Sequence, residues 1–361
     1  MWRARRALPH PQQTAFACPG LIKLELFPYP SQLGRPPGIV VKTQFALMLS
    51  SHVPPEETVG FAQLAEEIGV SRLWLTEDFY RKAGFASCGA ALGSTTQLSV
   101  GLGVTSLYMR HPTTLAMEIA TLHRMYGSRF EAGVGLGESR ELQGSGRMPE
   151  LVISATRDRL AVLAQLLAGE QVSWTDEFDT VHEARLRYPA DTNAPTWLAA
   201  EGPQMLALAR DCADGVVFSA FSTRAYLEWA TTILKKNGPY PTALYLHASV
   251  HEDSEVAANA ARNVVMRRIQ AGFTSSSLRR SGCWDAVEPL LGSSPDAIRP
   301  HLTEELVSAF VVFGTPEECR QKLQAFESTG VDEIALAPTM NNDPALLGEA
   351  ITLLGGVLTK S

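Results

Sequence analysis

The sequence predicts one (β/α)8 barrel, the TIM-barrel architecture, over residues 42–361. From residue 42 onward, short apolar segments with strand character alternate with segments of helical periodicity, which is the pattern of βα units in a parallel sheet. No change in composition divides this region into two domains. Because eight strand candidates are present, a closed barrel with insertions fits better than a doubly wound sheet.

The eight expected strands are short apolar runs at residues 43–49, 72–76, 98–105, 130–136, 196–200, 215–219, 244–250 and 332–337. Helices are expected between them at residues 56–68, 84–92, 112–126, 157–167, 203–212 and 226–236, followed by a helical region from 255 to about 306 that is interrupted near 275 and 293. Thr315 and Glu318 have the spacing of a capping box and open a last helix. Residues 172–188 alternate and are polar, so we expect a hairpin-like insertion there.

The composition limits the kinds of partner that this protein can bind. A hydrophobic fraction of 45% and a charged fraction of 19% are those of a globular protein with a sizeable core. The net charge of −7 argues against nucleic acid and acidic membranes, which require dense positive charge. None of the five cysteines forms a C-x-x-C pair, so we expect free thiols in a reducing cytoplasm and no metal site.

The first 41 residues differ from the rest of the chain. Arg3, Arg5 and Arg6 resemble the start of a signal peptide, but prolines at positions 9, 11 and 19 interrupt the apolar stretch that such a signal needs. We therefore interpret residues 1–41 as a loosely ordered N-terminal extension. No run of about 18 apolar residues is present elsewhere, so no transmembrane helix is expected.

In a parallel barrel, catalytic groups come from the carboxyl ends of the strands. Glu77 and Asp78 follow the second expected strand, and Glu138 follows the glycine-rich fourth. Because Glu77 and Asp78 are adjacent, their side chains point to opposite faces, and only one can face the barrel mouth. The other is expected to be a helix-capping or solvated carboxylate. The bare backbone beside Glu138 can approach a planar ligand closely.

The turn at residues 199–203 is a candidate phosphate site. Gly202 permits close approach and Pro203 can occupy the first helical turn, so exposed N–H groups would face a ligand, although many βα turns share this pattern. The chain has no dinucleotide fingerprint, no G-x-S-x-G nucleophile motif and no H-E-x-x-H metal motif. Arginines 140, 147, 157 and 159 are interpreted as a solvated face, or alternatively as an attraction for an anionic cofactor tail. His111 is expected to fill a helix entrance.

Several motifs together resemble a known family. GLGVTSLYMRHP, ATLHRMYGSRFEAGVGLGE, WLTEDF and GTPEECRQKLQAFESTGVDEIAL are similar to segments of the luciferase-like flavin- and deazaflavin-dependent oxidoreductases, nearest the F420-dependent methylenetetrahydromethanopterin reductase branch. The resemblance covers roughly residues 42–340. It implies a TIM barrel that binds coenzyme F420, or alternatively FMN, at the carboxyl-end mouth.

The resemblance also implies roles for particular residues. Gly103 and Val104 match a bulge that holds a non-prolyl cis peptide in several deazaflavin-dependent members and supports the cofactor ring, and Thr105 adjoins it. Glu138 matches an active-site glutamate. The residues that match the turn holding the cofactor phosphate are Ala200, Glu201 and Gly202.

The sequence departs from the family pattern at two places. Asp78 stands where many relatives carry a histidine implicated in proton transfer, and Ser106, Leu107 and Met109 replace an Asn, Pro and Thr of the reductase motif. A pterin substrate and sugar-phosphate oxidation with a histidine base are therefore disfavoured.

We expect an oxidoreductase that transfers a hydride between bound F420 and a small organic substrate, with Glu138 or Asp78 handling the proton. One alternative is an FMN-dependent monooxygenase that is supplied with reduced flavin by a partner reductase. Another is a flavin- or deazaflavin-binding protein without turnover. The resemblance also implies a homodimer.

Overall fold

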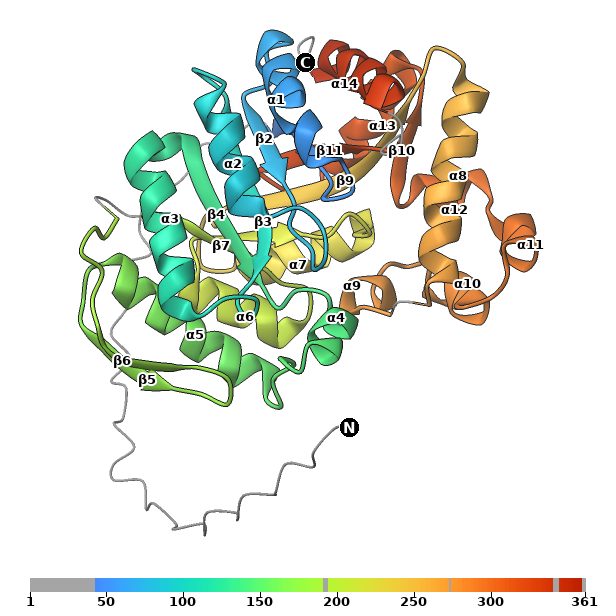
Figure 1. The fold of residues 1–361 in the computed structure, drawn as a ribbon. Coiled ribbons are helices and arrows are strands. Elements are labelled where there is room, and N and C mark those ends of the chain that lie inside the picture. The colour runs from blue at the N-terminus through green and yellow to red at the C-terminus, as the bar shows by residue number, and fades with distance from the viewer. Residues whose placement is uncertain (1–42, 191–193, 273, 340–343, 359–361) are drawn as a thin grey trace, which may run out of the picture. The chain divides into compact units, whose positions relative to one another are not determined.

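The computed structural model describes residues 43–190, 194–272, 274–339 and 344–358. Its centre is a closed, parallel eight-stranded barrel (Figure 1). Strand β9 closes the ring because it pairs with both β8 and β11. In ring order the strands are β9 (Thr242–Val250), β11 (Glu333–Pro338), β1 (Gln44–Leu49), β2 (Arg72–Leu75), β3 (Ser99–Ser106), β4 (Phe130–Gly135), β7 (Thr196–Ala199) and β8 (Gly215–Phe218). The predicted barrel and its eight strands are confirmed.

A further strand, β10 (Val311–Gly314), was not predicted. Its residue Val311 lies opposite His247 in the carboxyl half of β9, whereas β8 pairs with the amino half of that strand. The four residues of β10 are all buried and follow a series of short helices. A run this short does not have a periodicity that separates a strand from the end of a helix.

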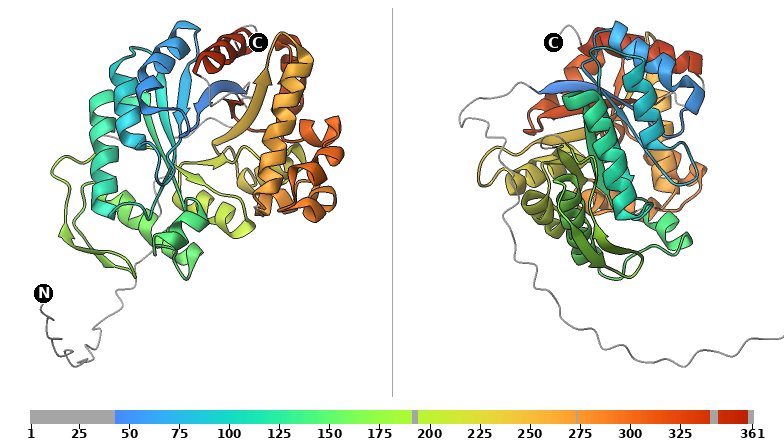
Figure 2. Two further views of the ribbon diagram at one scale, coloured as in Figure 1. Left: turned by 45° about the vertical axis from the view of Figure 1, so that its right-hand side comes forward. Right: turned by 60° about the vertical axis from the view of Figure 1, so that its left-hand side comes forward.

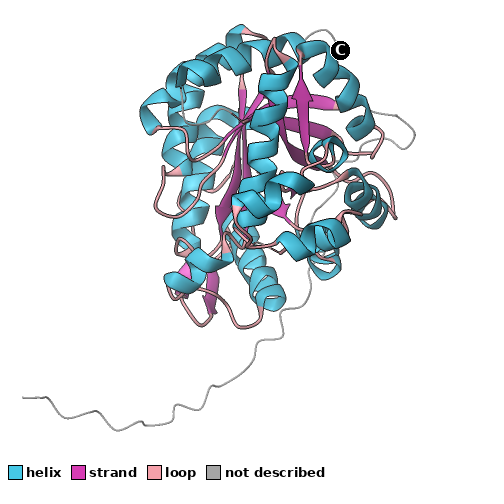
Figure 3. Cartoon of the chain, turned by 90° about the vertical axis from the view of Figure 1, so that its right-hand side faces the viewer, coloured by secondary structure: helices cyan, strands magenta, loops and turns pink. Residues whose placement is uncertain are grey.

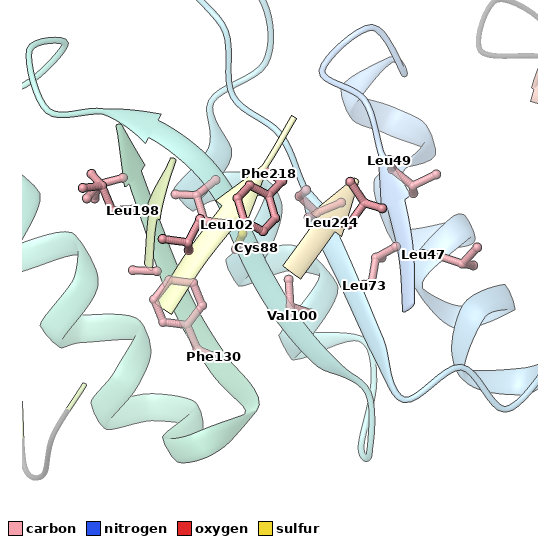
Figure 4. Close-up of a cluster of buried hydrophobic side chains, with 14 of the residues drawn as sticks. Leu47, Leu49, Leu73, Cys88, Val100, Leu102, Phe130, Leu198, Phe218 and Leu244 are labelled. Atoms are coloured by element: carbon pink, nitrogen blue, oxygen red, sulfur yellow. The ribbon is translucent and has the colours of Figure 1, made fainter. Parts of the chain in front are cut away.

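Helices surround the strands, as the rotated views show (Figures 2 and 3). Outward-facing strand residues pack beneath these helices, including Leu47, Leu73, Val100 and Phe130 (Figure 4). The capping box at Thr315 is present and opens α13 (Pro316–Glu327), but this is not the last helix, because α14 (Pro344–Leu358), which was not predicted, follows β11. The longer helices are α1 (Thr58–Glu67), α2 (Gly84–Gly93), α3 (Pro112–Tyr126), α5 (Val152–Leu167), α6 (Pro203–Cys212), α7 (Arg224–Leu234), α8 (Ser254–Gln270), α13 (Pro316–Glu327) and α14 (Pro344–Leu358).

The helical region after β9 is broken as predicted. The serine at position 275 caps a new short helix after α8. These helices and β10 enclose a second apolar cluster beside the barrel. The short elements are α4 (Ser139–Gly144), α9 (Ser276–Arg279), α10 (Trp284–Val287), α11 (Pro295–Ile298) and α12 (Glu304–Ser308), with 3-10 turns at Pro55–Glu57, Gly127–Arg129, Glu288–Leu290 and Arg299–His301.

The amino end of the barrel is closed by a polar network of five inward-facing side chains. Arg72 forms ion pairs with Glu131 at 2.7 Å and with Glu333 at 3.4 Å. The indole of Trp74 donates to Glu333 at 2.5 Å, and that of Trp197 donates to Glu131 at 2.7 Å. Burial of charged groups requires such pairing. This network forms a floor, so ligands can be held only nearer the carboxyl end.

The predicted insertion is an antiparallel hairpin of β5 (Val172–Thr175) and β6 (Thr180–Ala184). Arg159 on α5 is 1% exposed and binds Asp176 and Asp179 of the hairpin at 2.7 and 2.6 Å. Arg147 binds Asp179 at 2.5 Å. The interpretation of these two arginines as a solvated face is therefore wrong, because they hold the hairpin against the barrel.

The predicted extension at residues 1–41 lies outside the described residues. Within the described ranges, no helix has the length and apolar character needed to cross a membrane.

Candidate active site at the barrel mouth

Glu77 and Asp78 point in opposite directions at the end of β2, as their adjacency requires. Asp78 is half-buried and accepts a hydrogen bond from the Ser51 hydroxyl, which follows β1. Glu77 instead turns into the layer between the sheet and the helices, where it accepts from the Gly84 N–H in the first turn of α2 at 2.7 Å. Asp78 is thus the acid of this pair at the mouth, and Glu77 is the helix-capping carboxylate.

Glu77 is the centre of a buried network. Arg110 donates to both carboxylate oxygens, at 2.6 and 2.7 Å, and the Thr105 hydroxyl donates as well. Burial alone would raise the pKa of Glu77, but the hydrogen bonds from Arg110, Thr105 and Gly84 outweigh it and lower the pKa. Glu77 is therefore held ionised, and it positions the end of β3.

The end of β3 has the bulge that the resemblance implies. The peptide bond between Gly103 and Val104 is cis, and the β3–β4 register shifts between Leu102 and Thr105. Gly103 is buried, and a Cβ atom at this position would overlap the Tyr245 hydroxyl. Thr105 is fully buried on Glu77. Of the three predicted cofactor-binding residues here, only Val104 is half-buried, and it packs against the apolar cluster inside the barrel, which includes Trp74 and Tyr245.

Glu138 lies just after β4 and precedes α4. Gly137, at a φ of 91°, provides the left-handed turn that brings Glu138 to this position. Burial raises the pKa of Glu138; Asp78 and Glu141 also raise it, while Arg268 opposes them. The structure therefore brings Asp78 and Glu138, the two predicted catalytic acids, into one electrostatic neighbourhood.

The turn after β7 ends at the first residues of α6. Ala200 is buried, and the carbonyl of Glu201 accepts a hydrogen bond from Tyr226 at 2.8 Å. Gly202 is the N-cap of α6 and offers no side chain to cap it, and Pro203 opens the helix. The first free N–H groups of α6 are thus without a side-chain cap, which fits an anionic group.

A serine on α9 lies beside this turn. A Cβ atom at Gly202 would be 3.7 Å from the Ser276 hydroxyl, an ordinary contact distance, so the Ser276 side chain lies next to the Gly202 backbone. Arg280 donates to Ser276 at 2.9 Å. The Ser276 hydroxyl and the Arg280 guanidinium therefore lie close to the uncapped N-terminus of α6. Together with the free N–H groups of this helix, they are suited to bind a phosphate.

Three residues near α8 at the barrel mouth were not predicted from the sequence, namely Phe221, His247 and Arg268. The ring centres of His247 on β9 and Phe221 are 5.2 Å apart, and the guanidinium carbon of Arg268 lies 5.0 Å from the centre of the Phe221 ring. Counting alternate positions along β9 from Tyr245 would have placed His247 inward. Arg268 lies near the end of α8, the helix that follows β9, so its approach to Phe221 depends on how this helix packs and not on a local sequence pattern.

Two other expectations can be compared with the structure. His111 is the N-cap of α3, with its Nδ1 2.7 Å from the Thr113 hydroxyl, so it fills the helix entrance as expected. Among the residues that the structure describes, no three His, Cys, Asp or Glu side chains gather in a way that could hold a metal ion.

The geometry defines a class: a closed parallel-barrel protein with two acids, Asp78 and Glu138, after the carboxyl ends of its strands β2 and β4. The luciferase-like monooxygenase family model matches residues 37–333 of the chain. The chain therefore belongs to the luciferase-like monooxygenase family. Its relatives are named as oxidoreductase enzymes.

One relative in sequence and two solved structures are similar to this chain. The 5,10-methylenetetrahydromethanopterin reductase of Methanolobus tindarius is 26% identical over 308 residues, which are 81% of this chain and 94% of the relative. The structure of the coenzyme F420 dependent tetrahydromethanopterin reductase from Methanopyrus kandleri aligns with a TM-score of 0.75 at 22% identity, covering 88% of this chain and 99% of that one. A type II Baeyer-Villiger monooxygenase from Pseudomonas putida, in complex with FMN, aligns with a TM-score of 0.67 at 16% identity, covering 88% and 98%.

Proposed function

We propose that this protein is an oxidoreductase that transfers a hydride between bound coenzyme F420 and a small organic substrate. The observation that carries the proposal is Glu138, a half-buried acid with a raised pKa at the end of β4, within electrostatic range of Asp78. A raised pKa brings a carboxyl group closer to the pH at which it can both accept and return a proton. The coenzyme F420 dependent reductase from Methanopyrus kandleri, to which this chain is similar in fold, supports the choice of cofactor.

Particular residues of the mouth would hold the cofactor. Val104 would support one face of the ring, and the backbone of Gly103 and Thr105 would shape that support. The turn of Ala200, Glu201 and Gly202 would bind the cofactor phosphate through the N–H groups that open α6, with Ser276 and Arg280 beside it. When bound, the deazaflavin would supply or accept the hydride at a ring carbon.

The protein would then handle the proton. In substrate oxidation, Glu138 accepts the proton of the substrate hydroxyl, and in reduction it returns one. Asp78 is the second candidate, and its hydrogen bond from Ser51 fixes the carboxylate in place. Both groups reach the mouth from different strands, so they can stand on different sides of one substrate.

A parallel titration with oxidised F420 and oxidised FMN tests the cofactor. We expect F420 to bind at least about tenfold more tightly, which corresponds to 1.4 kcal/mol. Tighter binding of FMN, together with oxygen uptake during turnover, would instead support an FMN-dependent monooxygenase with a partner reductase. The FMN complex among the similar structures is the reason to include this arm. Failure to exchange a hydride with any donor or acceptor would favour a non-catalytic binding protein.

We further propose that the enzyme works as a homodimer, as the resemblance implies, and in the cytoplasm, as expected from cysteines that form no C-x-x-C pair. Sedimentation equilibrium of the purified protein tests the dimer. A monomer at micromolar concentration would contradict it.

A further inference from the structure

One wall of the mouth carries polar atoms that the protein does not pair. Within the described part of the chain, the Tyr245 hydroxyl, His247 Nδ1, the Ser249 hydroxyl and the Thr339 hydroxyl are buried and have no hydrogen-bond partner. Buried polar atoms are nearly always paired because leaving one unpaired costs free energy. Several such atoms on two neighbouring strands therefore indicate that a ligand forms hydrogen bonds with them.

The four side chains share the inner face of β9 and β11. Ala243 and Tyr245 on β9, and Ala335 and Ala337 on β11, belong to the cluster inside the barrel. Side chains alternate along a strand, so His247 and Ser249 continue the inner face of β9, and Thr339 continues that of β11. The Thr339 N–H donates to the Ala248 carbonyl at 3.1 Å, which extends the β9–β11 ladder and places Thr339 beside Ser249.

This wall faces the bulge of β3 across the barrel. β9 and β3 stand on opposite sides of the eight-stranded ring, and the Tyr245 side chain spans it, because a Cβ atom on Gly103 would overlap its hydroxyl. His247 lies two residues further along β9, about 7 Å nearer the carboxyl end. A molecule held above Tyr245 would therefore lie between Val104 on one side and His247 on the other.

The chemistry of the wall suits uncharged oxygen atoms. Burial, with help from Arg268 and Arg267, lowers the pKa of His247 to about 4, although the Ala337 carbonyl opposes the shift. The imidazole is therefore neutral near pH 7. The hydroxyl groups of Ser249 and Thr339 can each accept a hydrogen bond from a substrate hydroxyl or donate one to a carbonyl, and the neutral imidazole of His247 has one nitrogen that donates and one that accepts.

We propose that His247, Ser249 and Thr339 form the substrate-binding wall, and that this wall selects a substrate with a second oxygen next to the reacting carbon, namely a vicinal diol or an α-hydroxy ketone. The inference rests on the proposed hydride transfer and names the substrate class for the same site. One oxygen of the substrate is at the reacting carbon, and the wall binds the neighbouring one. A monofunctional alcohol leaves wall atoms unpaired.

The test compares matched substrates on the full-length protein loaded with F420. Oxidation of butane-2,3-diol is compared with that of butan-2-ol, and reduction of 3-hydroxybutan-2-one with that of butan-2-one. We expect kcat/KM to favour the bifunctional member of each pair by about tenfold, the scale of one well-placed hydrogen bond. Ser249→Ala, Thr339→Val and His247→Leu should each reduce this ratio, while His247→Asn, which keeps a polar group near the Nδ1 position, should retain part of it.

A second readout does not depend on turnover. Since the Ser249 and Thr339 hydroxyls have no partner in the described protein, Ser249→Ala and Thr339→Val should leave the melting temperature of the free protein unchanged or raise it. The matched control is Thr242→Val at the amino end of β9, where the hydroxyl donates to Asp332 at 2.8 Å. This control should lower the melting temperature and leave the substrate ratio unchanged.

The outcomes separate the two proposals. If F420 does not bind, both the proposed function and the wall are overturned. If F420 binds but neither bifunctional compound is preferred or turned over, only the wall is overturned. A fall in melting temperature for Ser249→Ala and Thr339→Val as large as that for Thr242→Val would also overturn the wall. Such a fall would show that the Ser249 and Thr339 hydroxyls stabilise the folded protein.

Discussion

Arg110 binds Glu77 through both ends of its guanidinium group, with Nη2 2.6 Å from Oε1 and Nη1 2.7 Å from Oε2. The two side chains are 15% and 1% exposed. The pair joins the end of β2 to the segment between β3 and α3, and Thr105 completes it from the bulge. The position of Val104 at this bulge therefore depends on a charge pair that does not itself face the mouth.

Replacing Glu77 with glutamine should destabilise the protein at pH 7. Removal of one member of a buried ion pair leaves the other charge without compensation, so we expect the free energy of unfolding to fall by about 3 kcal/mol. Urea denaturation measures this. Glu118→Gln is the matched control, because Glu118 binds Arg110 Nε at 2.6 Å but is 32% exposed. Its effect should stay below about 1 kcal/mol, and equal effects of the two variants would contradict the central role of Glu77.

The effect of Glu77→Gln should depend on pH. The pKa of Glu77 is lower in the folded state than in the unfolded chain, so the carboxylate stabilises the fold above the unfolded-state pKa, and this stabilisation is lost as the pH falls through the folded-state pKa. The difference between wild type and variant should therefore be large at pH 7 and shrink in acid. A difference that stays constant from neutral pH into acid would contradict this account.

Glu138→Gln should reduce turnover and spare cofactor binding. Loss of a general acid or base typically lowers the rate by about 10²–10⁴-fold, and we expect a fall in that range in kcat with the dissociation constant for F420 unchanged. Glu141→Gln is the control, since Glu141 is nearby but accepts a hydrogen bond from the Phe79 N–H at 3.2 Å. Turnover of Glu138→Gln close to that of wild type would instead indicate that Asp78 is the residue that transfers the proton.

The same substitution should stabilise the protein at alkaline pH. The pKa of Glu138 is raised in the folded state, so folding favours the protonated form, and stability is lost as the pH rises through the folded-state pKa. Glu138→Gln, which is always neutral, should therefore melt at a higher temperature than wild type at pH 8, with no such gain at pH 4. A lower melting temperature at pH 8 would show that the carboxylate supports the fold.

Thr315→Ala should weaken the start of α13. The Thr315 hydroxyl accepts from the Glu318 N–H, and the Glu318 carboxylate accepts from the Thr315 N–H at 2.7 Å. Loss of such a cap costs about 1 kcal/mol of unfolding free energy, measured by urea denaturation. Thr315→Ser keeps the hydroxyl and should behave like wild type, and a loss of the same size in both variants would contradict a capping role.

Features encoded in neighbouring residues could be predicted from the sequence. The bounds of α6 match the prediction because Gly202 and Pro203 mark its start, and the capping box at Thr315 was visible for the same reason. The opposite directions of Glu77 and Asp78 followed from their adjacency. Which of the two faces the mouth did not, because the answer depends on Arg110, 33 positions away.

The features that were missed depend on tertiary contacts. β10 is recognisable only through its pairing with β9, and Arg159 was assigned to a solvated face because its partners lie on a hairpin formed later in the chain. His247 is one of several scattered histidines in the sequence, and its position gains meaning only when β9, β11 and β3 enclose the same space. Local signals thus predict the elements, and contacts between distant elements decide which polar residues are structural.

The network of Arg72, Glu131 and Glu333 below the mouth has a kinetic consequence. Because this floor shuts the amino end, cofactor and substrate share one entrance. A ring held at Val104 and a substrate held at His247, as proposed above, would pass through this same opening. A substrate in place would therefore slow the release of the cofactor, which stopped-flow displacement of F420 at rising substrate concentration measures.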